Sequence, residues 1–185
     1  MAILLIFLGV ICLLGIFVIG GYNKGIKLRN YVREAFSTMD VYMKKRWDLI
    51  PNLVETVKSY AGHERGLLEK ITQLRNGNYS TMSNAKKLET NSELTQVLTR
   101  FFAVAENYPD LKANQNYMQL SNELSAIEND IANSRKYYNG TVRELNVFLE
   151  VFPTNIIGSV FGFKKEKMFE ISDTERQNMK VNFNE

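Results

Sequence analysis

The stretch AILLIFLGVICLLGIFVIGG, residues 2–21, decides the fold of this chain because it contains no charged side chain. In a helix that rises about 1.5 Å per residue, roughly 20 apolar residues span the hydrocarbon core of a bilayer. A cleavable signal peptide would have a basic segment before a shorter apolar stretch and a small-residue cleavage site after it, and this pattern is not found. The sequence therefore predicts a retained, single-pass transmembrane anchor over residues 1–22.

Cys12 lies inside this stretch and raises the alternative of a lipidated cysteine. A lipidation signal has a small residue immediately before the cysteine, whereas this chain has Ile11 there and no basic residue upstream. We therefore interpret Cys12 as a small apolar residue of the anchor. Because it is the only cysteine, the sequence excludes disulfides and multi-cysteine metal sites within one chain.

Basic residues follow the anchor, with seven Lys and Arg against two acidic residues between Lys24 and Arg46. Such residues close behind a transmembrane helix favour the cytoplasmic side, and each is attracted to anionic headgroups by roughly 1 kcal/mol. We therefore expect the N-terminus outside and the rest of the chain in the cytoplasm, with Lys24, Lys27 and Arg29 at the membrane interface. For the basic residues further along, a solvated helix face is the alternative.

Apolar residues recur every three or four positions through most of the remaining chain, which indicates amphipathic helices. The pattern predicts helices over about residues 28–50, 53–74, 92–107 and 110–152, with a surface loop at 75–91. Pro51 either starts a helix or kinks one. The predicted fold is all-α: the transmembrane helix, then an up-and-down four-helix bundle with antiparallel, coiled-coil-like packing over residues 23–171. Residues 172–185 are interpreted as a polar tail.

The apolar segment 153–163 within this domain is too short to cross a bilayer. If the helices run up and down from the membrane, the segment returns to the bilayer surface. Phe161 and Phe163 would then enter the interface, with Lys164 and Lys165 at the level of the headgroups. The alternative is that the segment folds over the open end of the bundle as an apolar cap.

Several blocks of sequence carry a family resemblance: YN at 22–23, KKRWDLIPNLVETVKSYAGHE at 44–64, YPDLKANQNY at 108–117, YNGTVRELN at 138–146, and FPTNIIGSVFGF with MFE at 152–170. Together they resemble the bacterial LemA family, and the chain departs from that pattern at Leu145, where the family has an aromatic residue. We expect the motif residues to have structural roles; they are Tyr22, Asn23, Arg46, Asp48, Pro51, Asn52, Tyr108, Pro109, Tyr138, Asn139, Pro153 and Gly162. Arg46 and Asp48 are expected to pair with charges such as Glu123, Glu128 or Arg135.

The resemblance implies a four-helix bundle that is anchored at its N-terminus in the inner membrane and exposed to the cytoplasm. It implies no defined biochemical activity. For some relatives it implies a part in building or shaping internal membranes, and for the group an association with membrane proteases and stress functions.

The sequence offers no recognisable catalytic apparatus. His63 is the only histidine, so neither a zinc-protease helix motif nor a multi-histidine metal site exists within one chain. Gly62 and Gly66 lack the Lys-Ser or Lys-Thr pair that a phosphate-binding loop needs. The acidic residues are interleaved with Lys and Arg, as on a solvated surface. We expect no enzyme activity, no cofactor and no bound metal.

Two functional hypotheses remain. The first is a membrane-anchored scaffold that self-associates and organises or remodels the bilayer, with Tyr60 and Leu67 as apolar positions in excess of one bundle's needs. The second is a monomeric adaptor that presents its bundle to a membrane protease or transporter. The expected partners are the lipid bilayer, further copies of the chain and other membrane proteins. Nucleic acid is not expected, because the basic residues lie beside the membrane and are not interleaved with exposed aromatics.

Overall fold

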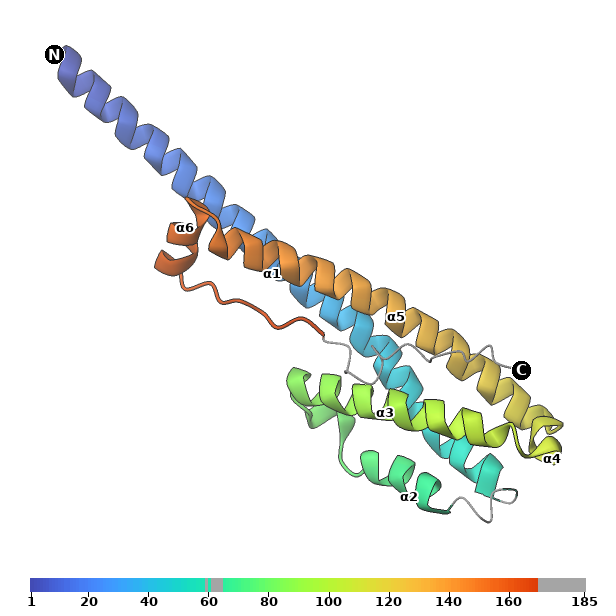
Figure 1. Cartoon of the computed structure of the whole chain (residues 1–185). Coiled ribbons are helices and arrows are strands. Elements are labelled where there is room, and N and C mark those ends of the chain that lie inside the picture. The colour runs from blue at the N-terminus through green and yellow to red at the C-terminus, as the bar shows by residue number, and fades with distance from the viewer. Residues whose placement is uncertain (59, 61–64, 170–185) are drawn as a thin grey trace, which may run out of the picture. The chain divides into compact units, whose positions relative to one another are not determined.

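The computed structural model describes residues 1–58, 60 and 65–169, and this part of the chain is helical without strands (Figure 1). The predicted all-α fold, with one long apolar N-terminal helix followed by further helices, is confirmed. The helices are α1 (Ala2–Lys58), α2 (Arg65–Leu74), the short 3₁₀ helix η1 (Tyr79–Thr81), α3 (Asn84–Ala105), α4 (Pro109–Lys112), α5 (Gln115–Glu150) and α6 (Thr154–Val160). His63 and the tail 172–185 lie outside the described residues.

The apolar stretch and the first amphipathic stretch form one helix, α1, of 57 residues. Among the described residues, α1 is the one helix that is long and apolar enough to cross a membrane by length and composition, and its apolar part is exposed. The helix continues through Pro51, which the sequence left as either a start or a kink. Proline has no N–H to donate to the carbonyl of Trp47, four residues earlier, so α1 makes one backbone hydrogen bond fewer at this point.

The predicted loop at 75–91 is shorter than expected, because α3 begins at Asn84. Ser83 caps this helix, since its side chain accepts a hydrogen bond from the backbone N–H of Lys86 at 3.3 Å. Within the remaining loop, η1 is capped by Asn78, whose side chain accepts from the N–H of Ser80 at 3.0 Å. The loss of apolar period therefore marked the start of the loop correctly but not its end.

The predicted helix 110–152 is in fact two helices. Pro109 begins α4, in agreement with the predicted break at Tyr108 and Pro109, and α4 ends at Lys112. Asn114 then starts α5, because its side chain accepts a hydrogen bond from the N–H of Tyr117 at 3.0 Å. The helix α5 ends at Glu150, two residues earlier than expected.

The chain divides into two compact units, of which unit 1 comprises residues 1–39 and 133–168. Its core lies between α1 and the C-terminal part of α5, and the ring of Phe36 meets that of Tyr138 with centroids 5.9 Å apart. The departure at Leu145 is accommodated, because this side chain is buried. The buried apolar residues of unit 1 are Leu28, Val32, Ala35, Met39, Tyr138, Val142, Leu145, Phe148 and Ile157.

Unit 2 comprises the described residues of 40–132 together with Phe169, and five helices contribute to its core. The core residues come from α1, α2, α3 and α5, with Leu111 from α4. Tyr60 and Leu67 also pack against this core. Both are half-buried against the bundle's own core, and this packing accounts for the apolar positions that the sequence had suggested were in excess.

Candidate membrane-interface site and polar core network

The segment after α5 folds into α6 because of three local features. The Thr154 hydroxyl donates to the backbone oxygens of Phe148 at 2.6 Å and Val151 at 2.9 Å, which satisfies carbonyls at the end of α5. Gly162 adopts a left-handed conformation with φ of +69°. The N–H of Phe163 then bonds the oxygen of Gly158 at 2.9 Å, so a Schellman motif ends α6 and turns Phe163 back toward α1.

This returning segment lies against the first residues that follow the apolar stretch (Figure 1). The ring of Tyr22 lies 4.8 Å from that of Phe161 and 6.0 Å from that of Phe163, measured between centroids. Ile157 packs against Gly21, and Phe163 against Gly25, where no side chain intervenes. The two glycines are the contact residues that sequence reasoning missed. Their signal was the G-x-x-x-G spacing immediately after the apolar stretch.

Gly25 provides a test of this contact. A Cβ atom there would lie 2.8 Å from Cζ of Phe163 and 3.2 Å from Cε1 of Phe148. We expect Gly25→Leu to lower the free energy of unfolding by about 1–3 kcal/mol through overpacking and to displace the 161–163 segment. The measurements are thermal unfolding and the rate of tryptic cleavage after Lys164 and Lys165. Gly140→Leu is the matched control, because nothing lies within 4 Å of a Cβ at Gly140; equal effects of both variants would contradict the prediction.

The predicted interface cations occupy different environments. Lys24, Lys27 and Lys164 are exposed. The guanidinium of Arg29 lies over the ring of Phe163 at 5.5 Å, and Lys165 forms an ion pair with Glu150 at 2.8 Å. All of them belong to unit 1, and their placement at a bilayer stays a prediction.

The most exposed apolar side chains at this end of unit 1 are not the ones that the sequence singled out. Phe163 is half-buried against α1, whereas Phe152 is 74%, Ile156 54% and Val160 72% exposed. Phe161 is 45% exposed. In the sequence, residues 153–163 form one apolar run, and only the helical geometry of α6 separates its buried face from its exposed face. We call Phe152, Ile156 and Val160 the exposed apolar set.

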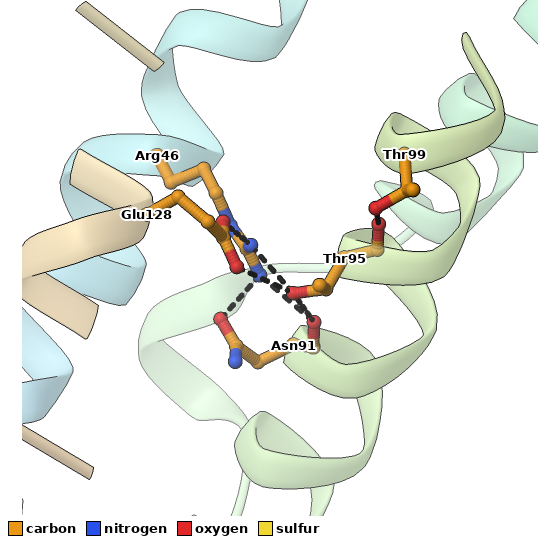
Figure 2. A network of polar contacts seen from close by, with 5 residues as sticks. All are labelled: Arg46, Asn91, Thr95, Thr99 and Glu128. Carbon is orange, nitrogen blue, oxygen red and sulfur yellow. Dashed lines mark hydrogen bonds and ion pairs between the residues drawn. The ribbon is translucent and has the colours of Figure 1, made fainter. Parts of the chain in front are cut away.

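Arg46 lies at the centre of a polar network inside unit 2 (Figure 2). Its side chain is completely buried and forms an ion pair with Glu128 of α5. The guanidinium also donates to the hydroxyl of Thr95 at 2.7 Å and to the backbone oxygen of Asn91 at 2.8 Å. Figure 2 shows Arg46 and Glu128 reaching the same part of α3. The network joins α1, α3 and α5, as expected for a buried charge that needs partners.

The other motif residues are dispersed. Asp48 pairs with Lys44 of its own helix at 2.5 Å, rather than with α5. The Tyr138 hydroxyl donates to the backbone oxygen of Lys167 at 3.0 Å. Of the remaining residues, Asn23, Asn52 and Pro109 are exposed, and Tyr108, Asn139 and Pro153 are half-buried. These positions do not form one site within the described residues.

Three buried tyrosines make the stability of the fold depend on pH in the alkaline range. Burial raises the pKa of Tyr79, Tyr117 and Tyr138 above the usual value of 10.0. A pKa higher in the folded than in the unfolded state means that the stabilisation is complete below about pH 10 and is lost as pH rises further. We expect the free energy of unfolding to fall above pH 10, measured by urea unfolding across the alkaline range. In a variant with Phe at all three positions, the free energy of unfolding should fall less over this pH range. Identical slopes of free energy against pH for the two proteins would contradict the assignment.

The described residues contain no group of three or more His, Cys, Asp or Glu side chains arranged to hold a metal. The raised tyrosine pKa values have structural causes, of which burial is the largest. The arrangement therefore offers two physical features: an apolar surface beside the end of the apolar stretch, and a buried charge network that fixes helix packing.

Residues 35–183 match the sequence model of the LemA family. Over 163 residues the chain is 27% identical to Protein LemA of Metamycoplasma hominis, covering 85% of this chain and 73% of that protein. It is 21% identical over 175 residues to Magnetosome protein MamQ 2 of Paramagnetospirillum magneticum, covering 80% of this chain and 64% of the relative. The match to Magnetosome protein MamQ of Magnetospirillum gryphiswaldense is 20% over 174 residues, with the same coverage. The chain thus spans less than two thirds of these magnetosome proteins.

Proposed function

The chain belongs to the LemA family, and from this premise we propose that it is a non-catalytic, membrane-anchored scaffold that self-associates and organises the bilayer around it. The N-terminal apolar helix is compatible with membrane anchoring. Orientation follows the basic residues behind this helix, which favour a cytoplasmic domain.

The observation that carries the proposal is the position of the exposed apolar set. The helix α6 is held against Gly21 and Tyr22, the residues at which the apolar stretch ends. If residues 2–21 span the bilayer, Phe152, Ile156 and Val160 lie near its surface. Amphipathic segments with aromatic and aliphatic residues on one face enter the boundary between headgroups and acyl chains. A scaffold that inserts such a wedge beside its anchor would perturb the leaflet locally.

Support for self-association comes from exposed tyrosines beyond the apolar stretch. Tyr31 on α1 is 47% exposed and Tyr137 on α5 is 52% exposed, both in unit 1. Tyrosine is enriched at protein interfaces, because it offers a large contact area with a polar tip. The names of the magnetosome relatives add support for a role in building a cellular structure rather than for one in metabolism.

The test is the mass of the full-length protein after extraction in a mild detergent, measured by light scattering and accompanied by negative-stain images. Large, discrete particles are expected, and Tyr31→Ser with Tyr137→Ser should shift them to smaller species. The matched control is Val41→Ser with Met118→Ser, which removes two exposed apolar side chains of unit 2. A monomeric wild type would overturn the scaffold and favour an adaptor for a membrane protease or transporter, to be identified by crosslinking.

A further inference from the structure

A groove of about 470 Å³ lies in unit 1 between α1 and the last turns of α5. Its interior is formed by Leu28 and Phe148, which are buried. Lys24 stands on the α1 side and Arg143 on the α5 side. The complete lining is Lys24, Leu28, Arg143, Glu144, Val147, Phe148, Val151, Phe152 and Thr154.

The groove combines cations with an exposed apolar wall. Lys24 and Arg143 are exposed, and neither forms an ion pair with another of the described residues. Further along the chain from Arg143, at the end of α5, Val147 is 49%, Val151 52% and Phe152 74% exposed. With Glu144 included, the charged residues in the lining sum to one net positive charge. This combination fits a molecule with a negative head and an apolar tail.

The order of residues along α5 gives the groove a direction. Arg143, Val147 and Val151 are four residues apart, so they share one face, and Val151 lies about 12 Å along the helix axis from Arg143. The helix α5 runs toward the anchor, because α6, which follows it, packs against Gly21. The apolar end of the groove therefore faces the anchor and the Arg143 end faces away from it, as a lipid's acyl chain and headgroup would.

The depth of the groove points to the same ligand. Lys24 follows the last residue of the apolar stretch by three positions, roughly 4.5 Å of helix. With residues 2–21 in the hydrocarbon core, Lys24 lies at the level of the headgroups. We propose that the groove binds an anionic phospholipid of the surrounding bilayer, with its phosphate between Lys24 and Arg143 and an acyl chain along Val147, Val151 and Phe152. The inference rests on the membrane position in the proposed function, but not on self-association.

Each element of the groove has a defined task in this binding mode. Arg143 offers two parallel N–H donors to the phosphate oxygens, and Lys24 adds a mobile ammonium charge from the opposite helix. The single negative charge of phosphatidylglycerol balances the net charge of the lining. Phosphatidylcholine has no net charge, and its quaternary ammonium has no N–H with which to donate a hydrogen bond to Glu144. The interaction of this headgroup with Glu144 is therefore weaker than that of an anionic headgroup with Lys24 and Arg143. The geometry therefore favours the anionic lipid.

The experiment uses the full-length protein in detergent and native mass spectrometry to count the phosphatidylglycerol or phosphatidylcholine molecules retained per protomer. We expect one phosphatidylglycerol, with phosphatidylcholine at least about tenfold weaker. The double variant K24Q/R143Q should lower phosphatidylglycerol affinity by about tenfold or more, since it removes both cations of the groove. R33Q/K136Q is the matched control, because it also removes one cation from α1 and one from α5, at exposed residues that do not line the groove.

A third variant, Val151→Glu, tests the apolar wall and should also weaken binding, while circular dichroism shows whether each variant folds. Equal retention of the two lipids, an unaffected K24Q/R143Q, or an equal loss in R33Q/K136Q would overturn the site. The particle mass measured on the same samples separates the two proposals. A monomer with selectively bound phosphatidylglycerol refutes the scaffold alone, whereas an oligomer without selectivity refutes the lipid site alone.

Discussion

Replacing Glu128 by glutamine is expected to lower the free energy of unfolding by about 3 kcal/mol. The substitution removes one charge and leaves the shape of the side chain nearly unchanged. Arg46 is completely buried and forms its ion pair with Glu128. In the variant the guanidinium loses the Glu128 carboxylate, and the acceptors that it keeps on Asn91 and Thr95 are neutral. A buried charge without its counter-charge is among the most costly defects in a protein interior.

The unfolding of unit 2 can be followed through Trp47, the only tryptophan, which is 5% exposed and lies next to Arg46 in sequence. Glu123→Gln is the matched control on the same helix. Its contact with Lys45 spans 3.9 Å between exposed side chains, so the loss should stay below about 1 kcal/mol. The double variant R46M/E128Q should be more stable than E128Q alone, because it also removes the buried cation that has lost the Glu128 carboxylate. If E128Q cost no more than E123Q, the network would not contribute as argued.

The fold class was predictable from the sequence because anchors and amphipathic helices depend on local composition and period. The hydrophobicity of residues 2–21 was sufficient to predict the anchor, and the spacing of apolar residues was sufficient to predict the helix α5. Along residues 110–152 the apolar spacing is interrupted at Ser134 and Arg135, directly after Asn133, where the two compact units divide. The sequence shows the interruption, but it does not show that the chain divides into two units there, because that division depends on contacts between distant residues.

Helix ends were less predictable than helix cores. Ser83 starts α3 through one capping bond, although the apolar period becomes clear only several residues later. Pro51 does not stop α1, because tertiary burial of residues on both sides, including Ile50 and Leu53, outweighs the local cost of proline. Local sequence signals do not determine where a helix ends if packing against distant helices contributes more free energy than one backbone hydrogen bond.

The contact of residues 153–163 with α1 was only partly foreseeable from the sequence, and the position of these residues at a bilayer stays a prediction. The sequence indicated that residues 153–163 return to the bilayer surface or fold over the open end of the bundle as an apolar cap. The structure places them against Gly21, Tyr22 and Gly25. It did not indicate which phenylalanine would be exposed, because that depends on the turn at Gly162. The groove was missed altogether, since its two cations are more than a hundred residues apart in the chain.

Replacing Tyr79 by alanine is the second change for which we expect a large effect, a loss of about 3–5 kcal/mol in the free energy of unfolding. Tyr79 lies in the segment predicted as a surface loop, yet it is only 6% exposed. Its ring centroid is 5.3 Å from that of Trp47, and its hydroxyl donates to Asp40 at 2.7 Å. Lys87 lies 4.8 Å from the ring and pairs with Asp40 at 2.6 Å. The side chain of Tyr79 therefore holds the segment between α2 and α3 against α1.

Tyr79→Phe separates the two contributions of this side chain, because it keeps the ring and removes the hydroxyl. It should cost only about 1 kcal/mol, since Asp40 keeps its ion pair with Lys87. Ser80→Ala, at the neighbouring exposed position, should change stability by less than about 0.5 kcal/mol. Urea unfolding of the full-length protein in detergent, followed through Trp47, measures all three. A loss below 1 kcal/mol in Tyr79→Ala would mean that this segment detaches from α1 at little cost and that burial of its ring contributes little to unit 2.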